Sequence, residues 1–375
     1  MEQILYIGIS QAFFAGLLIA LKRPRIMANQ VLASWFFLIC IEMIIVLINS
    51  NLVQLYSIKV LPFTYGPLMY LYAKMLTSRK PAFNYRYLWH FTPFLVFFIV
   101  SMIFLKEPVM EGTKGFLLVD RFISLRIIYS ICFFISITSY SFATFVIIHR
   151  HQKNLKEFIS YSSSKVTLQW LIGLSVTFYL SYILVFIVGL IDILLNIMPF
   201  DPYELSFLGL TIFAFLYGFY GFQQPAIFEE IVGKLDLPEQ NGDNSGPKYS
   251  RSGLKKKDIE LYKAKIGQYM EKEKAFLNRE LSITDMADDL KIPRHFITEV
   301  INLHMGKNFY YLVNEYRVRE VKERLLDPKY KNLTILAIAY DSGFNSKSAF
   351  NTIFKDLTGQ TPSEYQQSRS TEKSK

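Results

Sequence analysis

The chain has 375 residues, of which 51% are hydrophobic and 16% aromatic, and its formal net charge at pH 7 is +10. The mean hydropathy of +0.24 is unusual for a soluble globule and indicates membrane spans. The two cysteines, Cys40 and Cys132, both lie in apolar runs, which excludes a disulfide framework and a cysteine-based zinc site.

The first 222 residues contain seven apolar segments, each close to the roughly 20 residues that a helix needs to cross hydrocarbon. These segments cover residues 4–21, 31–48, 60–76, 87–105, 127–148, 171–193 and 205–222. The third segment is the weakest, because Pro62 and Pro67 interrupt it. The sequence predicts a bundle of seven transmembrane helices over residues 1–222.

Basic residues are distributed unevenly among the loops of this bundle. One set of alternate loops carries ten Lys and Arg residues, whereas the other carries three, which are accompanied by acidic residues. Because loops rich in Lys and Arg stay in the cytoplasm, the pattern predicts an N-terminus outside and a C-terminus in the cytoplasm. The basic cluster at 22–25 follows the first apolar run, so this run is interpreted as an anchor rather than a signal peptide.

Four polar or ionisable residues in the bundle are candidates for sensing a signal. Glu42 lies well inside a span, and His90 and Arg126 lie nearer to span ends; a buried ionisable group is costly and is by default a candidate site. Tyr65 belongs to "LPFTYGPLMYLYAKML", which could form a broken, aromatic-lined helix around a small ligand. Ordinary packing of the bundle explains the same residues, and no ligand is indicated.

Residues 223–257 are interpreted as a flexible cytoplasmic linker. Their middle part, "LPEQNGDNSGPK", is rich in Pro, Gly and Asn and has no helical period. It lacks the spacing of a phosphate loop, and the chain has no HExxH, GxSxG or Cys/His metal pattern. We therefore predict no catalytic residue, no metal and no cofactor.

The last third of the chain has a clear helical period and a basic excess. From residue 248 onward there are 24 Lys and Arg against 17 Asp and Glu. This excess fits nucleic acid, an anionic membrane surface or a plain solvated surface. The period predicts a domain over residues 258–366, whose first helix has one apolar face, and a polar tail over 367–375.

Two similar blocks in this domain each have the pattern of two helices joined by a tight turn. They read "ITDMADDLKIPRHFITEVINLHMGKNF" and "ILAIAYDSGFNSKSAFNTIFKDLTGQTP". In the second block, Ala339 allows a close helix crossing, Gly343 suits a left-handed turn, and Ser346 can cap the following helix. The polar face of that helix presents side chains that can contact bases or phosphates, namely Lys347, Ser348, Asn351, Thr352 and Lys355.

Residues from about 249 to 366 resemble the DNA-binding domain of the AraC/XylS family of bacterial transcription regulators. The resemblance is carried by "LSITDMADDLKIPRHFITEVIN", "NFYYLVNEYRVREVKERLL" and "IAYDSGFNSKSAFNTIFKDLTGQTPSEY". It implies two helix-turn-helix units, joined by a long helix, that enter successive major grooves of double-stranded DNA. The base-facing candidates that it implies are Arg294, His295, Thr298 and Glu299 in the first unit and Lys347, Ser348, Asn351 and Thr352 in the second, with Ser346 at the start of the second helix.

Three residues of the first unit depart from the family pattern. Lys291 stands at the turn where Gly is common, Pro293 stands at a usual Ser cap, and Glu299 stands where a base-contacting Arg can occur. The second helix-turn-helix unit therefore follows the family pattern more closely than the first.

These observations together predict an all-α protein: a seven-helix transmembrane bundle followed by a cytoplasmic domain of the AraC type. The predicted function is a membrane-embedded transcription regulator of the bacterial cytoplasmic membrane. Its partners would be double-stranded DNA, membrane lipid, an unknown small-molecule or envelope signal, and in one arrangement a second copy. Two alternatives stay open, namely a transporter or membrane enzyme with a regulatory DNA-binding tail and a DNA-binding protein that its spans only anchor.

Overall fold

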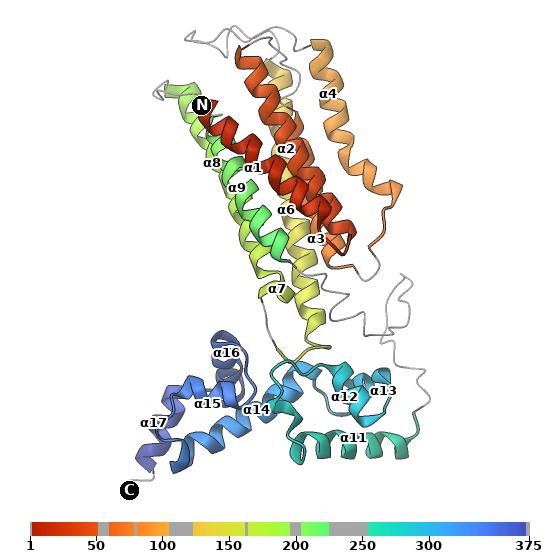
Figure 1. The fold of residues 1–375 in the computed structure, drawn as a ribbon, viewed down its shortest axis with the longest axis vertical. Coiled ribbons are helices and arrows are strands. Elements are labelled where there is room, and N and C mark those ends of the chain that lie inside the picture. Colours follow the sequence, from red (N-terminus) through yellow and green to blue (C-terminus); the bar gives the residue numbers. More distant parts are fainter. Residues whose placement is uncertain are drawn as a thin grey trace. The chain divides into compact units, whose positions relative to one another are not determined.

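A computed structural model describes residues 2–51, 60–78, 81–104, 123–161, 164–195, 204–224 and 254–372 (Figure 1). All the named elements in these ranges are helices, which confirms the predicted all-α class for the described residues. The chain forms two compact units. The first comprises Met1–His149 and Leu168–Gly233, and the second comprises Arg150–Thr167 and Lys234–Lys375.

Long apolar helices build the first unit. They are α1 (Glu2–Leu21), α2 (Met27–Asn51), α3 (Tyr65–Leu76) after the 3₁₀ turn η2 (Leu61–Thr64), α4 (Thr92–Phe104) after the 3₁₀ turn η3 (Tyr85–Phe91), α6 (Ile123–Leu155), α8 (Gln169–Leu195) and α9 (Glu204–Gln223). Within the described residues, six stretches are long and apolar enough to cross a membrane: Glu2–Leu21, Met27–Ile48, Tyr85–Ile103, Ile127–Leu155, Gln169–Asp192 and Glu204–Gln223.

The remaining predicted span, residues 60–76, has a different character. It is a 3₁₀ turn followed by a helix of 12 residues, and its side chains are buried except for the half-buried Tyr70 and Lys74. The predicted break in this segment is confirmed, because η2 and α3 differ in helix type. The number of seven spans stays a prediction.

Glycines allow α1, α2 and α9 to approach each other closely. A Cβ on Gly8 of α1 would lie 2.5 Å from the sulfur of Met43 and 2.7 Å from the hydroxyl of Thr211. A Cβ on Gly221 of α9 would lie 2.5 Å from Leu32 of α2. Small residues at such crossings let backbones pack tightly, which is the usual source of attraction between helices in lipid.

Shorter helices build the second unit around two apolar clusters. Its elements are α7 (Ser164–Thr167), α11 (Lys256–Glu271), the 3₁₀ turn η4 (Ala275–Leu277), α12 (Ile283–Leu290), α13 (Arg294–Glu299), the π-helical turn η5 (Val300–His304), α14 (Phe309–Leu326), the 3₁₀ turn η6 (Pro328–Tyr330), α15 (Ile335–Asp341), α16 (Lys347–Thr358) and α17 (Pro362–Glu372). The first cluster includes Met286 and Ile297, and the second includes Ile338 and Phe354.

Helix α14 belongs to both clusters. Leu312 and Val313 pack in the first cluster, and Val318 and Val321 pack in the second. The long helix that was predicted between the two blocks therefore fixes one block against the other.

Two predicted segments, the polar tail and the linker, fall only partly within the described residues. Helix α17 continues to Glu372, so a helix occupies most of the predicted polar tail. Most of the predicted linker, residues 225–253, lies outside the described residues.

Candidate nucleic-acid interface

The second helix pair, α15 and α16, is held by caps and a left-handed turn. Thr334 accepts a hydrogen bond from Ala337 N at the start of α15 (3.1 Å), and Ser346 accepts one from Ala349 N at the start of α16 (3.1 Å). The predicted cap at Ser346 is thus confirmed. Gly343 in the turn has φ +95°, a conformation that side chains disfavour.

Helix α16 has one buried and one exposed face. Phe350, Ile353 and Phe354 are buried in the second cluster. The exposed residues include the predicted reading residues Lys347, Ser348, Asn351, Thr352 and Lys355, together with Asp356 and Leu357. Helix α16 therefore presents amide, hydroxyl and ammonium groups to solvent from a backbone that its apolar face holds in place.

The first helix pair, α12 and α13, is built with different chemistry. A capping box begins α12: Ser282 Oγ accepts from Asp285 N (3.2 Å), and Asp285 Oδ2 accepts from Ser282 N (2.8 Å). Lys291 makes the turn with φ +53°, and Pro293 precedes α13 without a side-chain cap. Both departures from the family pattern are thus accommodated by the backbone.

The four predicted reading residues of α13 do not share one exposed face. His295 is exposed and Arg294 is half-buried, with its guanidinium 5.6 Å from the ring centre of Phe158. Thr298 and Glu299 are buried, with 8% and 5% of their surfaces exposed, and Thr298 donates a hydrogen bond to Arg294 O (3.0 Å). In this arrangement the two buried residues cannot contact a base.

Known proteins match the part of the chain that carries these two helix pairs. Residues 286–368 match the helix-turn-helix domain family. Similar proteins include three from Staphylococcus aureus, strains COL, MSSA476 and N315, each described as an uncharacterized HTH-type transcriptional regulator. Each is 27% identical over 105 residues, which is 28% of this chain and 14% of the relative. No solved structure matches.

The chain thus spans about one seventh of the length of these relatives. The matched family supports a DNA-binding domain over residues 286–368, and these relatives are described as transcriptional regulators.

A buried arginine stabilises the helix-turn-helix domain from within. Arg317 of α14 is 1% exposed. Its guanidinium donates hydrogen bonds to Phe276 O (2.8 Å), Ser160 O (2.7 Å), Asn314 Oδ1 (3.2 Å), Ser160 Oγ (3.0 Å) and Asn278 O (2.7 Å). Burial lowers the pKa of Arg317 to about 9, so the group remains charged at neutral pH.

Arg317 is not among the residues predicted from the sequence to have a role. In "NEYRVREV" it looks like its neighbour Arg319, which is exposed. A signal was present, because Arg317 lies four residues after Val313 and four before Val321, on the buried stripe of α14. A charge on such a stripe indicates a paired, structural group.

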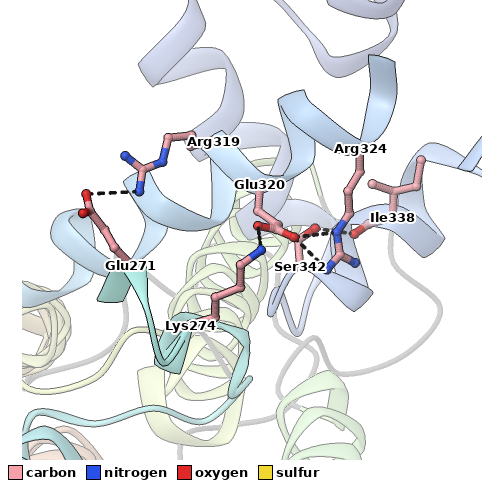
Figure 2. A network of polar contacts seen from close by, with 7 residues as sticks. All are labelled: Glu271, Lys274, Arg319, Glu320, Arg324, Ile338 and Ser342. Atoms are coloured by element: carbon pink, nitrogen blue, oxygen red, sulfur yellow. Dashed lines mark hydrogen bonds and ion pairs between the residues drawn. The ribbon is translucent and has the colours of Figure 1, made fainter. Parts of the chain in front are cut away.

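Glu320 of α14 links this helix to the turn after α11 through a second polar network (Figure 2). It accepts hydrogen bonds from Lys274 Nζ (3.0 Å) and Arg324 Nε (2.9 Å). Nearby, Arg319 and Glu271 form an ion pair of 3.7 Å between exposed side chains. Burial acts to raise the pKa of Glu320, but the hydrogen bonds and charges of Lys274 and Arg324 outweigh it and hold the pKa below its usual value.

Glu320→Gln is expected to destabilise the domain at pH 7 by about 1–3 kcal/mol, because a charged acceptor with two cationic donors is lost. The folded pKa of Glu320 is depressed, so its contribution is present above the unfolded value of about 4.3 and is lost as pH falls through the folded pKa. The difference between the variant and the wild type should therefore shrink at acid pH. Hydrogen exchange of α14 amides in the full chain measures this difference in stability.

Glu271→Gln is the matched control, because it removes a carboxylate from an exposed ion pair worth about 0–1 kcal/mol. Equal effects of the two variants at pH 7 would contradict the role assigned to Glu320.

The membrane-half candidates lie in different surroundings. Glu42 is 2% exposed and accepts a hydrogen bond from the Tyr65 hydroxyl, so the structure brings these two predicted residues together. His90 instead has Nδ1 3.0 Å from the Tyr140 hydroxyl. The Arg126 side chain lies outside the described residues. Within the described ranges, no three His, Cys, Asp or Glu side chains gather as a metal site.

Proposed function

We propose that the chain is a membrane-embedded transcription regulator that reads promoter DNA in a sequence-specific way through two helix-turn-helix units. The observation that carries this proposal is the exposed polar face of α16, on a capped helix inside the matched domain. As in the AraC/XylS family that the sequence resembles, α13 and α16 would be the two recognition helices. With α14 between them, they would enter successive major grooves about 34 Å apart.

Several observations support the membrane part of this proposal. The first compact unit, Met1–His149 and Leu168–Gly233, exposes large apolar side chains on many of its helices. They include Phe14 (60%), Ile135 (62%), Phe142 (68%), Leu184 (58%) and Phe215 (60%). Apolar surface of this extent requires a partner, and six helices among the described residues have the length and composition to lie in lipid.

The fold also supports a cytoplasmic location for the helix-turn-helix domain. Residues 150–167 belong to the same compact unit as the domain, so both would lie on one side of the membrane. Two apolar helices, α8 and α9, separate them in sequence, and two crossings return the chain to the side from which it started. Arg150, Lys153 and Lys156 favour the cytoplasm for that side by the positive-inside rule.

The seventh crossing would be made by η2 and α3. Four residues of 3₁₀ helix and 12 of α-helix rise about 26 Å, close to the hydrocarbon thickness of about 30 Å. Irregular backbone is tolerated at this depth where protein surrounds it, and residues 60–76 are almost entirely buried. Seven crossings would put the N-terminus outside.

A sensing role is proposed for the buried pair of Glu42 and Tyr65. A carboxylate buried in a span and bonded to a hydroxyl is a costly feature, and such features mark functional sites in membranes. The chemistry of the signal is open, and the two recognition helices on one chain leave both a monomer and a homodimer as reading species.

Selection of bound sequences from random duplexes by the full chain in lipid nanodiscs, at two salt concentrations, tests the function. Enrichment of a motif with two half-sites about one helical turn apart is the expected result. Salt-sensitive binding without a motif would reject sequence-specific reading.

Asn351→Ala is expected to relax the preference at one base pair of the selected motif by about 1–3 kcal/mol, because an exposed Asn can bond an adenine edge with both of its polar atoms. The measurement compares affinities for the motif and for its single-base variants.

Lys355→Ala is the matched comparison on the same helix. If its ammonium contacts phosphate, affinity should fall equally for all sequences, and the salt slope should drop by about one. The assignment of base reading to Asn351 would be wrong if both variants weakened every sequence alike.

A further inference from the structure

A short segment from the membrane half is seated on the helix-turn-helix domain. Residues 156–160, here called the docking segment, lie between α6 and α8 in sequence but belong to the unit that contains the domain. Its backbone pairs with the strand-like residues before α12: Ser160 N donates to Leu281 O (3.2 Å), and Ile283 N donates to Phe158 O (2.9 Å). The segment therefore adds to an edge of the domain by main-chain bonds.

Two carbonyl groups of the docking segment accept hydrogen bonds from N–H groups at the starts of helices in the domain. The first N–H groups of a helix have no partner within the helix. Phe158 O accepts from Ile283 N in the first turn of α12, and Lys156 O accepts from Tyr310 N in the first turn of α14 (2.9 and 3.0 Å). The docking segment thus supplies acceptors that the two helices need.

The buried side of the segment engages the charged centre of the domain. Ile159 and Ser160 are 2% and 1% exposed. Arg317 donates two of its hydrogen bonds to Ser160, and Asn314 Nδ2 donates a third to Ser160 O (3.1 Å). Because Arg317 also holds the carbonyls of Phe276 and Asn278, a displaced segment would disturb the loop before α12.

The segment also touches the first recognition helix. Arg294, the first residue of α13, lies with its guanidinium 5.6 Å from the ring centre of Phe158. We infer that the surface of the domain covered by the docking segment is a regulatory site, and that this segment of the same chain is its occupant. Helix α13 reads DNA when the segment is released. This inference rests on the proposed function.

The place of the segment in the chain gives it a direct connection to the membrane half. It follows the last residue of α6, Leu155, without a gap, and residues 161–168 lead to α8. A shift of either helix would pull on the segment.

A disulfide lock tests the inference in the full chain. Ile159 and Ser282 face each other in an antiparallel bridge. The bonds on either side make them a non-hydrogen-bonded pair, whose Cα atoms lie about 4.5 Å apart, within the range that a disulfide spans. Ile159→Cys and Ser282→Cys would be combined with Cys40→Ala and Cys132→Ala, in nanodiscs.

The disulfide is expected to form on mild oxidation. In a footprinting assay, the oxidised protein should then protect only one half-site of the selected duplex. Its affinity for the duplex should be at least ten-fold lower than that of the same protein after reduction. Each single Cys variant serves as a control for the substitution itself.

Ile159→Asp tests release without altering the domain's own residues. It should speed hydrogen exchange at Ile283 N and Tyr310 N. It should protect both half-sites, as the reduced protein does, and bind the duplex more tightly, because no docked state competes with DNA. Asn154→Asp, which adds the same charge at an exposed position, should neither speed this exchange nor tighten binding.

The outcomes separate docking of the segment, closure of α13 and DNA reading. Failure of the disulfide to form would reject the docked segment. Formation with an unchanged footprint would reject closure of α13. A missing footprint in every form, Ile159→Asp included, would reject the proposed function and the DNA step of this inference, while the disulfide and hydrogen exchange would still report the docking.

Discussion

Arg317→Met should destabilise the helix-turn-helix domain by about 3–5 kcal/mol, because the carbonyls of Phe276, Asn278 and Ser160 each lose a charged donor inside the domain. This is a large part of the roughly 5–15 kcal/mol that typically stabilises a domain. Arg317→Lys should recover part of the loss, because a single ammonium cannot reach acceptors on several sides. Hydrogen exchange of the amides of Val318 and Val321 in the full chain gives the size of the effect.

Arg319→Met on the same helix is the control. Arg319 is about half exposed, and its ion pair with Glu271 is 3.7 Å long, so about 0–1 kcal/mol is expected. Similar losses in the two variants would mean that the buried guanidinium contributes no more than a surface charge.

Gly343→Ala should destabilise the second helix pair by about 2–4 kcal/mol through two effects. The backbone of Gly343 has φ +95°, and a Cβ there would lie 2.2 Å from Phe276 O and 2.9 Å from Arg317 Nε. The carbonyl would have to move, and the bond that Arg317 makes with it would be lost or distorted. Hydrogen exchange in α15 and α16, together with loss of the second half-site from the footprint, measures the outcome.

Gly359→Ala separates the clash from the backbone strain. Gly359 has φ +75°, but a Cβ added there would meet open space within 4 Å, so about 1–2 kcal/mol of left-handed strain is expected alone. Lys291, with φ +53°, shows that this domain accepts a side chain at such a φ where space allows. If Gly343→Ala lowers the free energy of unfolding no more than Gly359→Ala does, the loop at Phe276 moves without a measurable cost.

Local patterns were sufficient to predict the helical class, the apolar helices and the two helix pairs. A helix period, a capping residue and a turn glycine are properties of neighbouring residues, so Ser346 and Gly343 could be assigned their roles from the sequence. The exposed face of α16 followed in the same way, since Phe350, Ile353 and Phe354 fix which side is buried. The side chains of Asn351 and Lys355 are therefore exposed to solvent.

Long-range contacts were beyond such patterns. The docking segment meets Leu281 and Arg317 across 121 and 157 residues of chain, and main-chain pairing carries little sequence signal. For the same reason, the burial of Thr298 and Glu299, two predicted reading residues, could not be foreseen from the period of a helix of six residues.

The sequence by itself determined that a long apolar half precedes a basic, helical domain with two helix pairs, because hydropathy, charge and periodicity are local quantities. The tertiary structure decided which charges are structural and which are open to a partner. It buried Arg317 while exposing Arg319, joined Glu42 to Tyr65, and seated residues 156–160 on the helix-turn-helix domain. The physical reason is that burial and hydrogen bonding depend on which distant segments meet.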